Sequence, residues 1–451
     1  MKSSHSSMNK KLRILILSTH RPSYSAGLGS DVMRCLKEGG HDVDFLCKYS
    51  TEFPKRGYKS IESRSAIKSI CARFFSKRIK SLFYKSRPDS SPKDLYKEKG
   101  MIFNDTYEIH YPDECRPGFP VDQLLEHINK NYDLVITLWW FDFINSTSLK
   151  EIYKKLHCPI MILSIDMAPV TGGCFYFNAC RRFERECGKC IAIGSDDSND
   201  FTHRNYLAKR DNYAAINCAF LGNSWMNEFA LRSGLFPKKN IFKIGCIIDE
   251  NEFIPADRRE LRSELGLAHD SIILLARSSK ELRKGARFII HAINTLPERF
   301  TERCSIVLVS IGDECLREHI QNKHIRHEYM GRIDRKALIK LYQISDFFLS
   351  PSIDDAGPSM VNQSQMCGTP VVCFNNGTAV DVVINGQSGF KTDDISEKGF
   401  SEILYRAIDM ACNDKVSYDE LRVTTRSTAL MTSSKARFQE NIMEYYQKMT
   451  S

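Results

Sequence analysis

The fold of this chain is decided by the stretch FFLSPSIDDAGPSMVNQSQMCGTPVVCFNNGTAVDVVINGQSG, residues 347–389. An apolar run typical of a buried strand leads into an acidic loop, and a helix is predicted from Ser359. Cys-Gly-Thr-Pro ends this helix, and a second apolar strand, VVCF, follows it. The loop places Asp354 and Asp355 beside backbone N–H groups and the positive end of the helix. This combination suits a phosphorylated ligand with several hydroxyl groups.

Length and composition indicate a globular protein with more than one domain. A chain of 451 residues is too long for one core and predicts two domains of about 200 residues each. The N-terminal sequence has no apolar signal core, and no apolar window of about 18 residues predicts a membrane span. Most of the 16 cysteines stand alone inside apolar runs. We therefore expect reduced thiols in a cytoplasmic protein.

The first domain is predicted to open with a continuous apolar strand, KLRILILST, at residues 11–19. A loop, a helix and a second strand follow, in the order typical of a doubly wound α/β domain. Gly27, Leu28 and Gly29 lie where backbone amides would meet a phosphate at a helix N-terminus. A plain strand-to-helix turn is the alternative interpretation, and the stretch alone does not decide between them.

Residues 55–85 carry ten Lys or Arg side chains and one acid, Glu62, which explains the net charge of +9. Apolar residues recur on one side of the helix or helices predicted here, with basic residues between them. Such a cationic amphipathic segment suits an anionic membrane surface. A helix packed on its own domain with a solvated basic face is the alternative. We expect no nucleic-acid partner, because no known reader motif accompanies the patch.

Two later apolar runs, residues 132–143 and 159–169, end in polar or aromatic side chains that include Asp142 and Asp166. In parallel α/β sheets the ligand meets the carboxyl ends of the strands. Asp166 is the better catalytic candidate because a Thr-Gly-Gly loop, residues 171–173, follows it directly. The alternative role for Asp166 is to cap that loop.

A cluster of four cysteines follows, with the spacing C-x5-C-x6-C-x2-C: Cys174, Cys180, Cys187 and Cys190. Four thiols within 17 residues are enough for a closed tetrahedral zinc site, so we predict a structural zinc ion here. The first two gaps are unusual for a zinc ribbon, and disulfides or unpaired thiols are the alternatives. A catalytic metal is disfavoured, because no His or carboxylate completes an open site.

The apolar pattern is interrupted at residues 236–251, where the boundary between the two domains is placed. The prediction is a first domain at residues 1–240, a second at 241–430, and a C-terminal helix at 431–451 that packs back toward the first. Alternating strands and helices predict a second parallel sheet. Arg277, Arg283 and Lys284 surround a strand-to-helix loop of this domain. These cations predict a diphosphate clamp, with a basic surface loop as the alternative.

Several motifs of the second domain, in this order, resemble those of retaining GT-B glycosyltransferases of family 4, also called group 1. They are IDENEFIP, the LRKG loop, GRIDRKALIKLYQISDFFLSPS, the acidic loop, CGTPVV and NGQSGF. The first domain is matched more weakly, through its glycine loop, DMAPVTGGC and AFLGNSWMNE. DMAPVTGGC with the cysteine cluster resembles a subgroup associated with bacterial surface-polysaccharide synthesis. The resemblance implies two Rossmann-like, doubly wound parallel-sheet domains that face a central cleft holding a nucleotide sugar.

The resemblance also implies roles for the cations and for the acidic loop. Lys284, with Arg277 or Arg283, would neutralise the donor diphosphate as it leaves, in place of a divalent metal. Asp355 and Gln363 fall on the two positions of the family's Glu-x7-Glu pair, which contact the donor sugar and the ribose. The remaining donor contacts would come from the acidic loop, the helix start and a segment beside the base: Asp354, Gly357, Pro358, Ser359, Gly331 and Ile333.

Three positions depart from the family pattern. Asp355 is one methylene shorter than the family glutamate, and Gln363 is neutral, although both can still bond to hydroxyl groups. Ile165 stands where relatives often carry a histidine, which gives Asp166 more weight as a catalytic residue. These changes are interpreted as retuning the donor site.

The expected function is transfer of a hexose from a nucleotide-diphosphate sugar to a saccharide hydroxyl, with the anomeric configuration retained. The acceptor would be a lipid-linked precursor of capsule, exopolysaccharide or O-antigen, bound on the first domain. The protein would be cytoplasmic and peripheral on the inner face of the plasma membrane. A non-catalytic or weakly active sugar-nucleotide binding protein is the rival expectation. A phosphorylase or an epimerase of the same fold is disfavoured.

Overall fold

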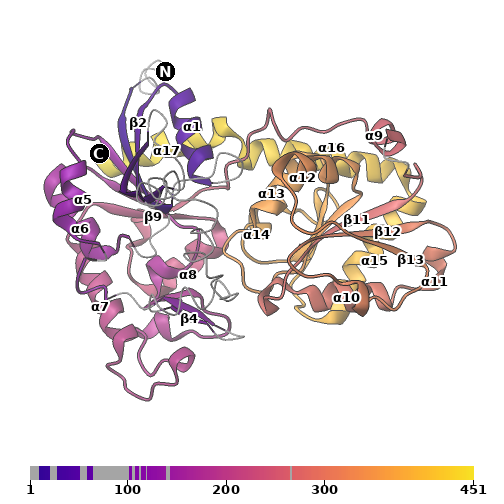
Figure 1. The fold of residues 1–451 in the computed structure, drawn as a ribbon, viewed down its shortest axis with the longest axis horizontal. Coiled ribbons are helices and arrows are strands. Elements are labelled where there is room, and N and C mark those ends of the chain that lie inside the picture. Colours follow the sequence, from indigo (N-terminus) through magenta and orange to yellow (C-terminus); the bar gives the residue numbers. More distant parts are fainter. Residues whose placement is uncertain are drawn as a thin grey trace, which may run out of the picture. The chain divides into compact units, whose positions relative to one another are not determined.

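The computed structural model describes residues 10–20, 28–50, 58–63, 101–103, 107–110, 113–117, 119–138, 143–264 and 267–451. The chain divides into two compact units (Figure 1). The first comprises Met1–Gly222, Asn227–Lys243 and Asn441–Ser451, and the second comprises Asn223–Met226 and Ile244–Glu440. In the part of the chain that is described, no helix combines the length and apolar character needed to cross a membrane.

The first unit is built on a seven-stranded sheet with the order β10-β9-β7-β6-β1-β2-β3. All of its strand pairs are parallel. The central strands β6, β7 and β9 are buried at every position, because helices cover both faces of a parallel sheet. The strands are β1 (Arg13–His20), β2 (Asp42–Ser50), β3 (Tyr58–Ser63), β6 (Leu134–Thr137), β7 (Ile160–Leu163), β9 (Cys218–Gly222) and β10 (Ile241–Lys243).

Strand β3 corrects part of the prediction for residues 55–85. The helical interpretation is wrong for Tyr58–Ser63, which pair in parallel with β2 at the edge of the sheet. Charged residues such as Lys59 and Glu62 are common in the sequences of edge strands. The rest of the predicted amphipathic segment, residues 64–85, lies outside the described residues.

Helices and a small antiparallel sheet complete the described part of the first unit. The helices are α1 (Leu28–Glu38), α5 (Val121–His127), α6 (Ser146–Leu156), α7 (Phe201–Ala214) and α8 (Ser224–Ser233), whose first residues belong to the second unit. The small sheet has the order β4-β5-β8, formed by Met101–Phe103, Glu108–His110 and Cys174–Tyr176. Short 3-10 turns at Ala168–Val170, Arg182–Arg185, Ile191–Ile193 and Lys238–Asn240 shape the loops.

The second unit is built on a six-stranded sheet with the order β13-β12-β11-β14-β15-β16. Every pair is parallel. The strands are β11 (Ile272–Ser278), β12 (Ile306–Gly312), β13 (Ile325–Tyr329), β14 (Phe347–Ser350), β15 (Val371–Phe374) and β16 (Gly389–Thr392). The strands predicted at 347–350 and 371–374 are therefore confirmed, and both lie side by side in the sheet.

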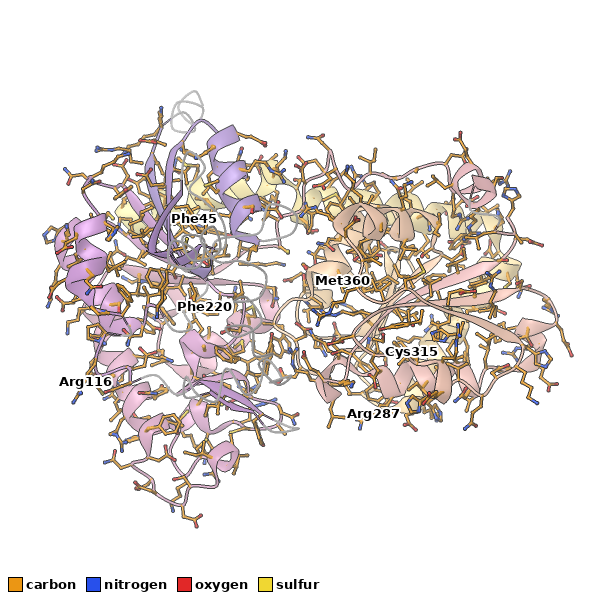
Figure 2. All side chains as sticks on the ribbon, in the orientation of Figure 1. Phe45, Arg116, Phe220, Arg287, Cys315 and Met360 are labelled. Carbon is orange, nitrogen blue, oxygen red and sulfur yellow. The ribbon has the colours of Figure 1, made fainter. Side chains whose placement is uncertain are left out.

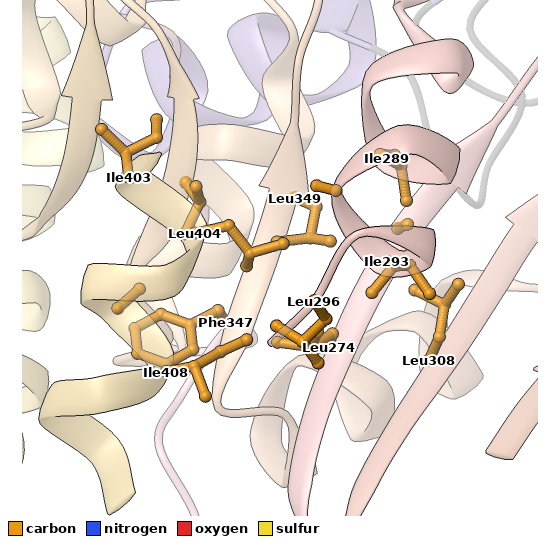
Figure 3. Packing of buried hydrophobic residues seen from close by; sticks show 14 of the residues in the cluster. Leu274, Ile289, Ile293, Leu296, Leu308, Phe347, Leu349, Ile403, Leu404 and Ile408 are labelled. Atoms are coloured by element: carbon orange, nitrogen blue, oxygen red, sulfur yellow. The ribbon is translucent and has the colours of Figure 1, made fainter. Parts of the chain in front are cut away.

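Helices cover both faces of this sheet, and alternate side chains of each strand enter two separate cores. In β14, Phe347 and Leu349 share one core with residues of α10 and α15 (Figure 3). Phe348 belongs to the other core, with residues of α12 and α13. The helices are α9 (Arg258–Glu264), α10 (Ala286–Asn294), α11 (Glu298–Thr301), α12 (Arg335–Ile344), α13 (Ser359–Met366), α14 (Ala379–Val382), α15 (Glu397–Asn413) and α16 (Lys415–Ser433). Turns at Leu282–Lys284 and Arg317–His319 lie between them.

A buried ionic network holds the start of β14. Arg262, which is 1% exposed, donates to Asp346 at 2.7 Å, and Arg258 also pairs with this carboxylate. The backbone N–H of Ile273 and the hydroxyl of Tyr418 donate to Asp346 at 2.6 and 2.8 Å. Burial alone would raise the pKa of Asp346, but the two guanidinium groups and these hydrogen bonds hold it below its ordinary value.

The last helix, α17 (Lys435–Thr450), begins in the second unit and ends in the first. The ring of Tyr445 stacks on Phe242 of β10, with ring centroids 4.5 Å apart, and its hydroxyl donates to the carbonyl of Lys243. Asn217 donates to the carbonyl of Met449 at 2.8 Å. Residues from the end of the chain therefore complete the sheet edge of the first unit.

Candidate functional site

Two glycines allow other segments to approach the acidic loop after β14 closely: Gly285, which follows the Leu282–Lys284 turn, and Gly377, which follows β15. A Cβ added to Gly285 would lie 2.0 Å from the carbonyl oxygen of Pro351, and one added to Gly377 would lie 2.1 Å from that of Asp355. Both glycines also have positive φ, which other residues rarely adopt. The backbone N–H of Ile353 donates to the carbonyl of Arg283 at 2.8 Å. These contacts bring the predicted cation loop and the acidic loop together.

At this junction the predicted cations and the predicted carboxylate meet. Lys284 donates to Asp355 through a short contact, and Arg283 lies 3.7 Å from the same carboxylate oxygen. The other carboxylate oxygen accepts the N–H of Gly357 at 3.3 Å. The side chains of Lys284 and Asp355 are 11% and 6% exposed, so this ion pair is largely shielded from water. Asp354, the neighbouring acid, is also buried.

The surroundings of Lys284 act on its pKa in opposite directions. Burial lowers the pKa of this amine from 10.5, the Asp355 carboxylate opposes the change, and Arg283 and Arg277 add to it. A phosphate group beside Lys284 would favour the charged amine in the same way as the carboxylate does. The site therefore gains electrostatically from a bound anion.

A small cavity of about 50 Å³ lies beside Lys284, at the carboxyl end of β14. Its wall includes Arg277 and, at the start of α13, Pro358, Ser359 and Met360. Met360 is labelled in Figure 2. No side chain caps the N–H groups at the start of this helix. Two of the three predicted amide donors are ruled out, because the Gly357 N–H is bonded to Asp355 and Pro358 carries no N–H. Ser359 is left as the first available amide of the helix.

The predicted ribose contact lies on helix α13, and the predicted base contacts lie on the loop after β13, all in the second unit. The carbonyl side of Gln363 accepts a hydrogen bond at 3.2 Å from Tyr342, which is fully buried. Gly331 has a φ of +62° and accepts the N–H of Gly312 at 2.9 Å, which joins the loops after β12 and β13. Ile333 packs against the core that includes Tyr342. Because the Gln363 carbonyl accepts from Tyr342, the Gln363 amide NH2 is the group that would donate to a ribose hydroxyl.

Several residues that hold the acidic loop were not predicted. Asn223 donates to the carbonyl of Ala356 and caps the start of α8 by accepting the N–H of Met226 at 2.9 Å. Asn376 donates to the carbonyl of Ser352 at 2.6 Å. The only sequence signal for these positions is an Asn before a helix or a Gly, which is common in ordinary turns.

In the first unit, the structure shows Asp166 in the role that was given as the alternative. Its carboxylate accepts the N–H of Ala168 at 2.8 Å and so caps the turn at Ala168–Val170. The side chain remains half-buried. Leu28 and Gly29 open α1, whereas Gly27 and Asp142 lie outside the described residues. A catalytic role for Asp166 and a phosphate contact at the glycine loop therefore stay predictions.

A buried lysine holds the loop that follows Asp166. Lys209, 1% exposed, donates to the carbonyls of Ala168 and Thr171 at 2.6 and 2.7 Å. The carboxylate of Glu114, 2% exposed, lies 3.5 Å from this amine and accepts both the N–H and the hydroxyl of Ser146 at 2.8 Å. This pair could not be predicted from the sequence, because its members are far apart in the chain.

The four cysteines of the predicted zinc site lie in one region, and all are free thiols. They line a cavity of about 20 Å³ together with Thr171, Phe177, Phe183 and Thr202, among others. Burial raises the pKa of the Cys174 thiol well above its ordinary value and that of Cys187 to about 12. Within the described ranges, no group of three or more His, Cys, Asp or Glu side chains is arranged to hold a metal ion. Zinc stays a prediction.

Comparison with known proteins adds a family match to this geometry. Residues 257–420, which carry the cations and the acidic loop, match the family model of glycosyl transferases group 1. Over 154 residues the chain is 25% identical to D-inositol 3-phosphate glycosyltransferase 2 of Catenulispora acidiphila. This alignment covers 32% of this chain and 36% of the relative, so it spans little more than a third of that protein.

Solved structures resemble nearly the whole chain. Sucrose-phosphate synthase from Thermosynechococcus elongatus superposes with a TM-score of 0.63 at 14% identity, over 98% of this chain and 99% of that one. HepE of Anabaena, solved in complex with UDP-glucose, gives a TM-score of 0.57 at 15% identity, over 97% and 99%. The fold is GT-B. The predicted fold class, with two Rossmann-like parallel-sheet units, is confirmed.

Proposed function

We propose that the protein is a retaining glycosyltransferase that moves a hexose from a nucleotide-diphosphate sugar to a saccharide hydroxyl. The observation that supports this most is the meeting of Lys284, Arg283 and Asp355 beside the start of α13. It lies inside the stretch that matches the group 1 family model. Cations largely shielded from water, beside the N-terminus of a helix, are what a diphosphate requires.

In the proposed reaction, the bond between the anomeric carbon and the donor phosphate oxygen breaks, and the acceptor hydroxyl oxygen bonds to the same face of that carbon while its proton passes to the departing diphosphate. Negative charge then grows on the diphosphate. Lys284 and Arg277 would stabilise this charge, and Asp355 would bind hydroxyl groups of the sugar. We propose that these cations suffice without a catalytic metal, so turnover would persist in excess EDTA.

The identity of the donor is tested by thermal shift with UDP-, GDP-, dTDP- and ADP-sugars. Because a ligand that binds only the folded state stabilises it, one nucleotide should raise the unfolding temperature more than the others. A UDP-sugar is the first compound to try, because HepE was solved with UDP-glucose. If none of the four stabilises the wild type more than a Lys284→Ala variant, the proposed donor site is wrong.

For the acceptor, we propose a lipid-linked saccharide, a precursor of a bacterial surface polysaccharide, met at the cytoplasmic membrane surface. This rests on the ten basic residues within residues 55–85. Flotation with liposomes containing anionic lipid should recover the protein, and replacing basic residues of 64–85 by glutamate should abolish recovery. Equal recovery with neutral liposomes would contradict the membrane proposal.

A sugar-nucleotide binding protein without transferase activity is the second candidate. It is favoured by the replacement of both family glutamates, by Asp355 and Gln363, and by the ion pair that already occupies Asp355. Release of free nucleoside diphosphate from the stabilising donor separates the two. The enzyme should turn over, and Lys284→Ala and Asp355→Ala should each abolish turnover while the protein stays folded. Donor binding without turnover would favour the second candidate.

We also propose that the four cysteines hold a structural zinc ion. The purified protein should then contain one equivalent of zinc, and Cys187→Ser with Cys190→Ser should lose it. Metal-free protein with unchanged stability would leave the cysteines as unpaired reduced thiols.

A further inference from the structure

A larger cavity, of about 440 Å³, opens on the loop that carries the four cysteines. This volume falls within the range of small-molecule binding pockets, roughly 300–1,000 Å³. The cavity belongs to the first unit, and the proposed donor site does not contribute to it. Its walls are formed by Arg181, Arg182, Glu184, Arg185, Cys187, Gly188, Lys189 and Ser198.

The lining of this cavity is strongly basic. Four of its eight residues are cations, and the single acid, Glu184, is already neutralised. The Glu184 carboxylate lies 2.8 Å from Arg232, which is not part of the wall, and 3.9 Å from Arg181. Glu186, next to the wall, pairs with Arg210 at 2.6 Å. The cavity is therefore left with an excess of positive charge.

Two of the cations have no partner within the described part of the protein. Arg185 and Lys189 are exposed, and neither side chain makes a hydrogen bond or ion pair with a described residue. Arg181, in contrast, donates to the carbonyls of Asn178 and Cys180, and Arg182 donates to that of Gly188 at 3.3 Å. One arginine and one lysine are thus available to a ligand.

The floor of the cavity is a fixed piece of backbone. Four successive residues, Glu186 to Lys189, have positive φ, a conformation that costs about 1–2 kcal/mol for each residue other than glycine. Hydrogen bonds from four successive backbone N–H groups hold them, from Cys187 to Arg182, Gly188 to Thr202, Lys189 to Asp197 and Cys190 to Asp200. A Cβ at Gly188 would lie 2.3 Å from the carbonyl oxygen of Ser198. The side chain of Lys189 therefore starts from a defined position.

We propose that this cavity binds a phosphate or diphosphate ester through Arg185 and Lys189. A guanidinium group can hold two phosphate oxygens at once, and an ammonium group adds a compact charge beside it. The ester could be a soluble sugar phosphate or the headgroup of a lipid diphosphate, since both present the same oxygens. The proposal does not depend on the glycosyltransferase activity proposed above.

Hydrogen exchange of the full-length protein, titrated with inorganic pyrophosphate, tests this site. Peptides covering residues 181–198 should become protected, and this local readout is separate from binding at Lys284. In an Arg185→Glu, Lys189→Glu variant, half-protection should need at least about tenfold more pyrophosphate, the scale of one charged hydrogen bond. An Arg185→Gln, Lys189→Gln variant should show a smaller loss and serves if the charge reversal disturbs folding.

The matched control is Lys238→Glu with Lys239→Glu, which changes the net charge equally on exposed residues of the same unit. This control should leave the protection of residues 181–198 unchanged. Equal losses in both variants would show a general charge effect, and no protection of this stretch would show that it binds no phosphate. Either result overturns the proposal.

Vesicles distinguish the two sources of the ester. If the headgroup is the ligand, vesicles of neutral lipid doped with a polyprenyl diphosphate should protect residues 181–198 in the wild type but not in the charge-reversed variant. If only soluble pyrophosphate protects, the ligand is a free phosphate ester. In both cases donor-induced thermal shift should be the same for wild type and variant, which separates this site from the proposed donor site.

Discussion

Two loops of the molecule invite comparison, residues 165–173 in the first unit and residues 351–358 in the second. Each follows a buried parallel strand, β7 or β14, each contains aspartate, and each is held by a lysine that is buried (Lys209) or largely shielded from water (Lys284). The lysines bond to different groups. Lys209 donates to two backbone carbonyls, whereas Lys284 donates to the carboxylate of Asp355.

This difference separates a structural lysine from one suited to a ligand. Lys209 donates to two backbone carbonyls of the loop itself, so its replacement should disturb the loop. Lys284 is paired with another side chain, and a phosphate can take the place of that partner or share the amine with it. An aspartate-containing loop after a parallel strand therefore does not reveal by itself whether the lysine that holds it serves the fold or a ligand.

The largest expected effect comes from Lys209→Met. The change leaves Glu114 as a buried charge without its cation and two carbonyls without their donor, so it should destabilise the first unit by about 3–5 kcal/mol. Urea unfolding, followed by circular dichroism, measures the loss. A loss below about 1 kcal/mol would show that Lys209 does not support the loop.

The same substitution at the lysine that holds the other loop, Lys284→Met, should lower turnover instead of stability. If Lys284 stabilises transition-state charge as proposed, its loss should lower the turnover rate by about 10²–10³-fold. The urea midpoint should move much less than for Lys209→Met, because Arg283 and the Gly357 N–H remain beside Asp355. A variant that unfolds like Lys209→Met would remove the distinction between the two loops.

Gly285→Ala should separate the cation turn from the acidic loop. Its Cβ would collide with the carbonyl of Pro351, which adds about 1–3 kcal/mol of overpacking to the cost of a positive φ. Gly386→Ala is the matched control, because its φ of +73° nearly equals the +74° of Gly285 and a Cβ there meets nothing within 4 Å. The free energy of unfolding and the donor affinity of both variants test this, and both should fall more for Gly285→Ala than for Gly386→Ala. Equal effects would mean that close approach is unimportant.

The smallest effect is expected from pH and concerns Asp346, at the other end of β14 from Asp355. Its pKa is lower in the folded protein than its ordinary 3.8, so its stabilising contribution is complete well above pH 3.8. The contribution is lost as pH falls through 3.8 toward the pKa of Asp346 in the folded protein. The total loss is about 1.4 kcal/mol for each unit by which folding lowers this pKa. Urea midpoints measured between pH 6 and 3 should fall in this direction. A rise on acidification would contradict the assignment.

The second unit was predictable because its strands are buried on both faces. Such strands read as continuous apolar runs, and ligand groups gather at their carboxyl ends, which pointed to Lys284 and Asp355 from the sequence. Contacts between distant residues gave no such signal. Tyr342 reaches Gln363 from another helix, and Glu114 meets Lys209 across the first unit.

In the first unit the prediction failed where local pattern and tertiary position disagree. Residues 58–63 lie in a segment with helical periodicity and many basic residues, yet they form an edge strand. Pairing with β2 decides their conformation, and edge positions accept the charges that a central strand would exclude. Asp166 illustrates a second limit, because its residue type and position fit both a catalytic group and a cap.

The path of α17 has a consequence for how the protein is made. The edge strand β10 of the first unit gains its stacking partner, Tyr445, only after the whole second unit has been translated. Domains usually fold as they leave the ribosome, beginning with the N-terminal one. Here Phe242 of the N-terminal sheet has to wait for its stacking partner until Tyr445 emerges. A ribosome that stalls after residue 440 would therefore hold a first unit whose sheet edge is open to chaperones or to another chain.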